Sequence, residues 1–236
     1  MLFSLLNALT SGNGIGMELG VHFLVLVFVT GICLPIHESA HALAAHWLGD
    51  DTGKLKGRIS LNPLAHLDLY GTLLMFLVGF GYAKPVPVNI RNFPAEKRKF
   101  YFALTAIAGP TSNLLLALVF LICYCGVLKY AYVNLILSNW IRVLLYFFQY
   151  AALINITLAV FNLIPVPPLD GSRVLTAVLP DKIYYKIMAY ERYMVIGLFI
   201  VILLLNRLGF SPISILSGYV FDGLLKLAGL PFGLTV

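Results

Sequence analysis

Two histidines and a glutamate lie close together near the end of the first long apolar stretch of the chain. His37, Glu38 and His41 form the pattern His-Glu-x-x-His. On an α-helix, residues four apart share one face, so both imidazoles can bind one zinc ion while Glu38 lies beside them as a potential general base. The pattern therefore predicts a metal site with hydrolytic chemistry on this helix.

A catalytic zinc ion takes three protein ligands and keeps one position open. His46 is a poor third ligand, because nine residues after His37 it points to about the opposite side of the helix. Asp170 is preferred, because three prolines between 165 and 168 must unwind the backbone before it, and irregular backbone at membrane depth needs protein or a water-filled cavity beside it. Two alternatives stay open: Asp170 begins an ordinary loop turn, or Asp68 is the third ligand.

The elements that position these residues are predicted to be membrane helices. Of 236 residues, 60% are hydrophobic and 11% charged, and the mean hydropathy is +0.92. A soluble globule could not bury so much apolar surface. The formal net charge is +6, but the basic residues fall in short loops between apolar runs, so we expect contact with lipid and no nucleic-acid partner. We expect an all-α polytopic membrane protein that forms one domain over residues 1–236.

The predicted bundle has about five to six membrane segments. The spanning candidates are 22–47, 102–128, 140–164 and 193–208, with 212–230 as a weaker one. The run 69–82 is shorter and is flanked by basic loops on both sides, which favours a re-entrant hairpin with both loops in the cytoplasm.

This topology brings the candidate ligands to one side of the membrane. The run 140–164 returns the chain to the cytoplasmic side, so the segment with Asp170 meets the end of the first span. If Trp47 marks the interface, His37 lies about 15 Å deeper along the helix, where polar residues are costly unless they bind something or line a wet cavity.

Several motifs together resemble the site-2 protease family of intramembrane zinc metalloproteases, in its compact form without a PDZ or CBS domain. After the His-Glu-x-x-His helix, the matching pieces are NPLAHLDxxG at 62–71, GYAKPVPVN at 81–89, AGPxxN at 108–113 and NxxPxxPLDG at 162–171. Their order and spacing make the resemblance specific. It covers a core of about 22–173.

The resemblance implies one Zn²⁺ per chain, held by His37, His41 and Asp170, with Glu38 activating the attacking water. It also implies that the stretches 57–61 and 84–89 form short β-strands able to pair with an unwound substrate. The residues expected to contact substrate are Pro85, Val86 and Asn162. For Asn162, a helix-packing amide is an equally weighted alternative.

The implied function is zinc-dependent endopeptidase activity on transmembrane or membrane-adjacent segments of other proteins, that is, regulated intramembrane proteolysis. We expect an integral protein of the cell (inner) membrane with its active site towards the cytoplasm. The alternatives are a catalytically silent zinc-binding membrane chaperone and a metal transporter. Glu38 argues against the first, and the lack of matching broken helices in two halves argues against the second.

Overall fold

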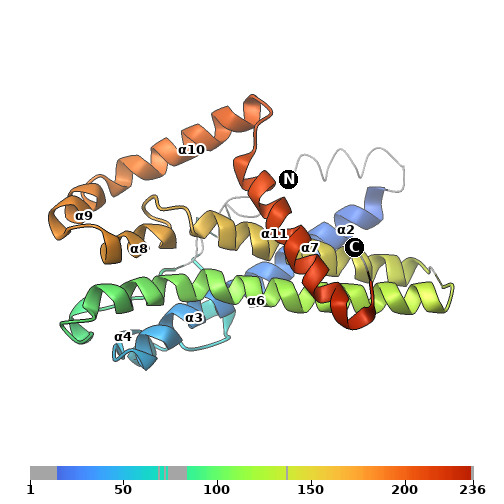
Figure 1. Cartoon of the computed structure of the whole chain (residues 1–236), viewed down its shortest axis with the longest axis horizontal. Helices are drawn as coiled ribbons and strands as arrows, with labels where there is room; N and C mark the ends of the chain where they lie inside the picture. Colours follow the sequence, from blue (N-terminus) through green and yellow to red (C-terminus); the bar gives the residue numbers. More distant parts are fainter. Residues whose placement is uncertain (1–14, 69, 72, 74–83, 137, 235–236) are drawn as a thin grey trace.

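The computed structural model describes residues 15–68, 70–71, 73, 84–136 and 138–234, which are predominantly helical (Figure 1). The first helical stretch comprises α2 (Ile15–Phe28), the π-helical turn η1 (Val29–Cys33) and α3 (Leu34–Trp47). The short elements α4 (Thr52–Leu55), η2 (Pro63–Ala65) and η3 (Ile90–Asn92) follow. The remaining helices are α6 (Arg98–Val133), α7 (Asn139–Asn162), α8 (Asp170–Val178), α9 (Asp181–Met188), α10 (Glu191–Arg207), α11 (Pro212–Gly229) and η4 (Leu230–Phe232).

Within the described residues, four helical stretches are long and apolar enough to cross a membrane: Gly20–Trp47, Arg98–Val133, Asn139–Asn162 and Pro212–Phe232. A fifth is possible if α9 and α10, which meet at an angle of 67°, count as one broken span. The all-α polytopic prediction is thus confirmed. The predicted span at 193–208 qualifies only together with α9, whereas the weaker candidate at 212–230 qualifies alone. Apart from 70, 71 and 73, the predicted hairpin lies outside the described residues.

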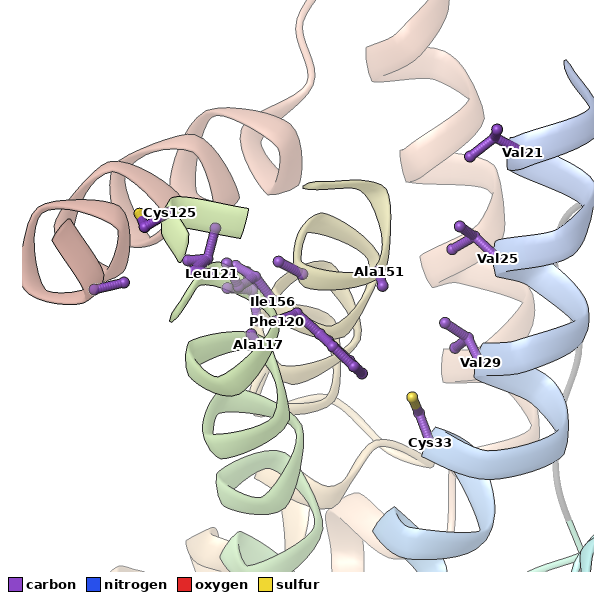
Figure 2. Packing of buried hydrophobic residues seen from close by; sticks show 13 residues of the cluster. Val21, Val25, Val29, Cys33, Ala117, Phe120, Leu121, Cys125, Ala151 and Ile156 are labelled. Carbon is purple, nitrogen blue, oxygen red and sulfur yellow. The ribbon is translucent and has the colours of Figure 1, made fainter. Parts of the chain in front are cut away.

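The first span shows how one helix separates its packed face from its lipid-facing side. Val21, Val25, Val29 and Cys33 recur every four residues and are buried in the core, as Figure 2 shows. Exposed apolar side chains occupy positions between them, at 23, 24, 27 and 32. In a membrane such side chains contact lipid rather than water, so their exposure is expected of a spanning helix.

Helices α6 and α7 form the centre of the bundle. Small buried residues, among them Ala117 on α6 and Ala151 on α7, allow the two backbones to approach closely (Figure 2). Helix α11 packs on the same pair, with Ala228 in the buried cluster. Its end is fixed by a hydrogen bond of 2.8 Å from Lys129 Nζ to the carbonyl oxygen of Phe232.

The two stretches predicted as short strands, 57–61 and 84–89, are not strands in the structure. They are joined instead by the side chain of Arg58, which donates to the carbonyl oxygens of Lys84 and Pro85. The guanidinium takes acceptors that a strand partner would need, and the two prolines of 84–89 have no N–H to contribute to a ladder. The strand prediction is therefore wrong for the chain on its own.

The elements that carry the candidate site lie at one end of the bundle, at the left in Figure 1. Helix α4, the start of α6, α8 and α9 are gathered there, and Lys99 forms an ion pair of 2.7 Å with Asp181. The turn between α6 and α7 lies at the opposite end, where η4 also contacts α6 through Lys129. The basic segments around 54, 97 and 182 thus share one end, as the charge pattern predicts.

Cysteine labelling from each side of the membrane should divide the chain in the same way. Single cysteines at Lys54, Glu96 and Lys182 should react with an impermeant maleimide from the cytoplasmic side, because short loops rich in Lys and Arg remain there. A cysteine at Asn134 should react only from outside. A cysteine at Gly233 should also react only from outside, as one at Asn134 does, because the end of α11 lies beside the far end of α6.

The background for this experiment is a variant in which Cys33, Cys123 and Cys125 are replaced by serine. Labelling of position 96 from outside would place an additional crossing within 69–82. Labelling of position 233 from the cytoplasm would contradict the arrangement of α11.

Candidate metal centre

Helix α3 presents the histidine pair to the interior directly after a change in helix geometry. Pro35, in the first turn of α3, lacks the N–H that would bond to the carbonyl oxygen of Gly31, and the π-helical turn η1 lies at this break. His37 and His41 are only 4% and 7% exposed. The two rings make an edge contact at 86° with centroids 4.8 Å apart.

A main-chain carbonyl of α6 fixes the orientation of the His41 ring. His41 Nδ1 lies 2.7 Å from the carbonyl oxygen of Thr105, which can only accept, so Nδ1 carries the proton. The other ring nitrogen, Nε2, then has a free lone pair that faces His37. This arrangement, in which one nitrogen binds a carbonyl and the other is free, is typical of metal-binding histidines.

Asp170 joins the histidines from the start of α8. The carboxylate Oδ2 lies 3.3 Å from Nε2 of both His37 and His41. Burial by itself would raise the pKa of Asp170, but the two neighbouring histidines outweigh it and hold the pKa well below its ordinary value. The group is therefore an ionised, anionic donor.

Glycine at 171 makes this position of α8 possible. A Cβ at Gly171 would lie 2.2 Å from the carbonyl oxygen of Leu163, at the end of α7. Only glycine allows the start of α8 to approach the preceding backbone so closely. Helix α8 is also attached to α6, because Arg173 stacks over the ring of Phe102 at 5.6 Å.

The three donor atoms form a nearly equilateral triangle. The third side, between Nε2 of His37 and Nε2 of His41, measures 3.2 Å. Donors bound at about 2.0 Å to one tetrahedral ion must lie about 3.3 Å from one another. In the described part of the chain, His37, His41 and Asp170 are the one group of at least three His, Cys, Asp or Glu side chains that could hold a metal ion. The donor set and its spacing therefore fit zinc.

Gly109 on α6 keeps space open beside this triangle. A Cβ at this position would lie 2.3 Å from His41 Nε2 and 2.7 Å from His37 Cε1. Any side chain here would occupy the volume next to the donor nitrogens or push the rings apart. The glycine thus leaves room beside the three candidate donors and is not needed for a turn, since it lies within a continuous helix.

We expect Gly109→Ala to lower zinc affinity by roughly 100-fold or more, since even changes outside the ligand set cost 10–100-fold. Zinc content after dialysis against graded zinc buffers is the measurement. The matched control is Gly126→Ala on the same helix, where an added Cβ would make an ordinary contact of 3.5 Å with Phe232. Alanine is the better helix former at both sites, so both variants should fold. Equal zinc binding by both would contradict the steric role of Gly109.

A cavity of about 610 Å³ opens onto the metal centre. Glu38 lines it together with both histidines and Asp170, so the predicted base shares one space with the predicted ligands. The rest of the wall is largely apolar. It includes the predicted substrate contacts Pro85, Val86 and Asn162.

The structure gives the competing polar residues other partners. Asp68 Oδ1 accepts hydrogen bonds from the main-chain N–H groups of Tyr70 and Gly71, each at 3.0 Å, as a helix cap does. The buried ring of His66 bonds to the carbonyl oxygen of Ser60 at 2.8 Å. His46 pairs with Asp51 near the end of α3.

Some contributors to the site were missed from the sequence. Thr105 acts through its carbonyl oxygen, which carries no residue-type signal. Val195, Leu198 and Phe199 of α10 line the cavity, and their spacing of three and four residues is the only hint of a shared face. Arg173 also lines it, two residues after the end of the NxxPxxPLDG motif.

Comparison with known proteins decides the family. The profile of Peptidase family M50, the site-2 protease family, matches residues 25–205. The chain belongs to peptidase family M50. Family membership confirms the resemblance and makes this M50 chain a membrane metalloprotease with Zn²⁺ as its metal.

The M50 chain is 42% identical over 168 residues to a Bacillus subtilis (strain 168) protein named "Putative zinc metalloprotease YwhC". The matched region covers 71% of the chain and 75% of the relative. Proteins named "Putative zinc metalloprotease Rip2" are 28% identical over 158 residues in Mycolicibacterium smegmatis and 30% over 159 in Mycobacterium tuberculosis H37Rv. The M50 chain spans 56% of the length of each Rip2 relative. No solved structure gave a significant match.

Proposed function

We propose that this M50 chain is a zinc-dependent endopeptidase that cuts transmembrane or membrane-adjacent segments of other proteins, with His37, His41 and Asp170 as zinc ligands. The observation that carries the proposal is the shared cavity. One space holds a triangle of metal donors, the carboxylate of Glu38 and a wall of mainly apolar side chains. Such a wall suits a substrate segment that comes from a lipid environment.

The depth of the site supports an intramembrane reaction. His37 lies within the span Gly20–Trp47, ten residues from its Trp47 end, which corresponds to about 15 Å along the axis. Ionisable residues at this depth are costly and mark functional sites. The cavity beside them, of about 610 Å³, has room for the water that hydrolysis needs.

The residues of the chain divide the chemistry between them. Zinc, when bound, lowers the pKa of its water and polarises the scissile carbonyl. Glu38 accepts a proton from the water as the new C–O bond forms, and it donates that proton to the amine nitrogen as the C–N bond breaks. His41 is held in the productive tautomer by the Thr105 carbonyl, and Asp170 supplies the anionic ligand.

The substrate is proposed to bind as an unwound peptide along the cavity. Pro85 and Val86 form one wall, and Asn162, at the end of α7, offers an amide to the substrate backbone. An extended peptide exposes main-chain groups that a helical segment keeps bonded, so the substrate must unwind before cleavage. The partners are therefore membrane-spanning proteins or peptides that unwind readily.

We further propose that residues 1–236 act as one domain in the cell membrane, with the metal centre towards the cytoplasm. The basic segments at the site end of the bundle support this orientation.

Removal and return of zinc tests the proposed function. The protein purified in detergent should cut a fluorescence-quenched peptide with an apolar stretch of about 20 residues. Cleavage should stop after dialysis against a chelator and return with one equivalent of zinc per chain. Zinc binding without any cleavage would favour a silent chaperone or a metal carrier, and cleavage that survives zinc removal would exclude the proposed mechanism.

A further inference from the structure

Helix α9 presents two lysines beside two isoleucines. Lys182 and Lys186 are one turn apart and share a face, and Ile183 and Ile187 lie on the adjacent face. Both lysine side chains are exposed. Among the described side chains, neither lysine has a carboxylate within ion-pair distance. Helix α9 therefore carries two unpaired positive charges next to an apolar strip.

These four side chains line a hollow of about 490 Å³ where α9 meets α10. Tyr190, in the turn, and Met194, in the first turn of α10, complete its lining, and the six residues together form the elbow groove. The two helices meet at an angle of 67°. Glu191, the first residue of α10, is not part of the lining. The elbow groove is thus both basic and apolar, with no carboxylate among its six described lining residues.

The elbow groove lies at the end of the bundle where the basic segments gather. Lys99, at the start of α6, forms an ion pair of 2.7 Å with Asp181, so the acidic residue next to Lys182 is already engaged by another cation. Figure 1 shows α9 beside α8 at this end of the bundle. In the proposed orientation this end faces the cytoplasmic leaflet, whose anionic lipids attract basic side chains. The groove therefore lies at the level of phospholipid headgroups.

The lining of the elbow groove suits an amphipathic anion. A phosphodiester can bind the ammonium groups of Lys182 and Lys186, as basic pockets on the cytoplasmic side of membrane helices bind acidic headgroups. The upper part of an acyl chain can then contact Ile183, Ile187 and Met194 and bury apolar surface, which a soluble phosphate could not do. Charge and apolar surface together therefore fit an anionic phospholipid better than a free anion.

The elbow groove and the cavity of the metal centre are lined by adjacent residues of α10. Met194 lines the groove, and Val195 lines the cavity together with Leu198 and Phe199. Along its length, α10 makes few close backbone approaches to other described helices. The position of this wall of the cavity therefore depends on how α10 is held at its ends. A ligand in the elbow groove would hold the end that follows α9.

We propose that the elbow groove binds an anionic phospholipid of the cytoplasmic leaflet, and that the bound lipid holds the α10 wall of the metal cavity in place. The headgroup phosphate binds Lys182 and Lys186, and an acyl chain covers the two isoleucines. The choice of leaflet follows from the proposed orientation. The lipid site itself does not require the chain to be a protease, whereas its effect on cleavage rests on the proposed function.

Native mass spectrometry of the protein in detergent measures the lipid site without any cleavage. Wild type should retain phosphatidylglycerol over phosphatidylcholine by roughly tenfold, because two lysines attract one acidic headgroup. The double variant Lys182→Gln/Lys186→Gln should lose this preference. The matched control is Lys56→Gln/Lys97→Gln, which removes the same charge from exposed lysines outside the groove and should keep the preference.

Two further arms of the experiment identify the ligand. Ile183→Ser keeps both charges and should still weaken the retention of phosphatidylglycerol, because the acyl chain loses an apolar contact. Ile183 is 50% exposed, so we expect this variant to fold. Excess glycerol phosphate should not displace the lipid. Displacement by glycerol phosphate, with no effect of Ile183→Ser, would identify a site for soluble anions and would overturn the lipid assignment.

Cleavage in lipid nanodiscs tests the effect of the lipid on the metal cavity. With an uncharged apolar peptide, addition of phosphatidylglycerol to phosphatidylcholine nanodiscs should raise kcat/KM several-fold for wild type and for the Lys56→Gln/Lys97→Gln control. The same addition should leave kcat/KM of Lys182→Gln/Lys186→Gln nearly unchanged.

The outcomes separate this inference from the proposed function. Absence of zinc-dependent cleavage by wild type in either lipid would overturn the proposed function and the effect on α10, but not the lipid site. No lipid preference in wild type, or an equal preference in the Lys182→Gln/Lys186→Gln variant and its control, would overturn the site. A lost preference in that variant, with an unchanged response of its cleavage to phosphatidylglycerol, would overturn the effect on α10 alone.

Discussion

Replacing Glu38 by glutamine should abolish peptide cleavage while leaving the zinc content unchanged. Glu38 lines the cavity beside the metal donors but is not one of the three atoms in the donor triangle. Glutamine keeps the size of the side chain and removes its ability to accept a proton at neutral pH. Since positioned acid–base groups contribute about 10²–10⁴-fold to rate, we expect kcat to fall by about that factor. Steady-state cleavage of the quenched peptide, with zinc determined on the same sample, is the measurement.

The control for Glu38→Gln is Glu96→Gln, at an exposed glutamate of the loop before α6. This control should cleave as wild type does. Turnover by Glu38→Gln within a few-fold of wild type would remove Glu38 from the mechanism and require another base in the cavity. A zinc content that falls with activity would make Glu38 a ligand and would contradict the three-donor arrangement.

Asp170→Ala should lose both zinc and cleavage. Its carboxylate oxygen is one corner of the donor triangle, at 3.3 Å from both histidine nitrogens, and it is the only anion among the three donors. Two imidazoles alone leave two positions of a tetrahedral ion open to solvent. We expect zinc affinity to fall more than roughly 100-fold, beyond the 10–100-fold cost of losing an outer partner. Competition with a zinc-sensitive dye measures the affinity directly.

Asp68→Ala is the decisive comparison for this prediction. Asp68 caps the helical residues at 70–71 and should affect local stability by about 0.5–2 kcal/mol without touching zinc. Full zinc occupancy and cleavage in Asp170→Ala, with loss of both in Asp68→Ala, would move the metal site to the hairpin. Loss in Asp170→Ala alone would assign Asp170 as the third ligand.

The sequence predicted the part of the site that depends on local spacing. His37, Glu38 and His41 come from one helical turn, so helix geometry alone places them together. Asp170 follows His41 by 129 residues. Its position could still be inferred, because the prolines before it end the helix and the charge pattern returns that span to the same side.

The sequence could not predict contacts made by main-chain atoms, or the space that a glycine leaves by having no side chain. The Thr105 carbonyl orients His41, and Gly109 leaves the space beside it, yet neither role depends on a reactive side chain. The strands expected at 57–61 and 84–89 failed for a similar reason. Their pairing groups are taken by Arg58, a tertiary contact that no local propensity reveals.

Hydropathy predicted where the long membrane segments lie better than it predicted their number. The long apolar spans follow directly from composition, because only a closed set of helical hydrogen bonds satisfies the backbone in lipid. Helix α10 is different, since its 17 residues qualify only in combination with the bent α9. Its cavity-facing residues are as apolar as its lipid-facing ones, so hydropathy does not distinguish the two.

Mapping the cut bond in a membrane-embedded substrate tests the central claim most directly. Wild-type protein and a single-span peptide are reconstituted together in lipid vesicles, and the products are identified by mass spectrometry, with Glu38→Gln vesicles in parallel. The account predicts zinc-dependent cleavage within the apolar segment or within a few residues of its cytoplasmic end, and an intact peptide with Glu38→Gln. An intact peptide with zinc-loaded wild type, or a cut confined to the opposite side of the membrane, would contradict it.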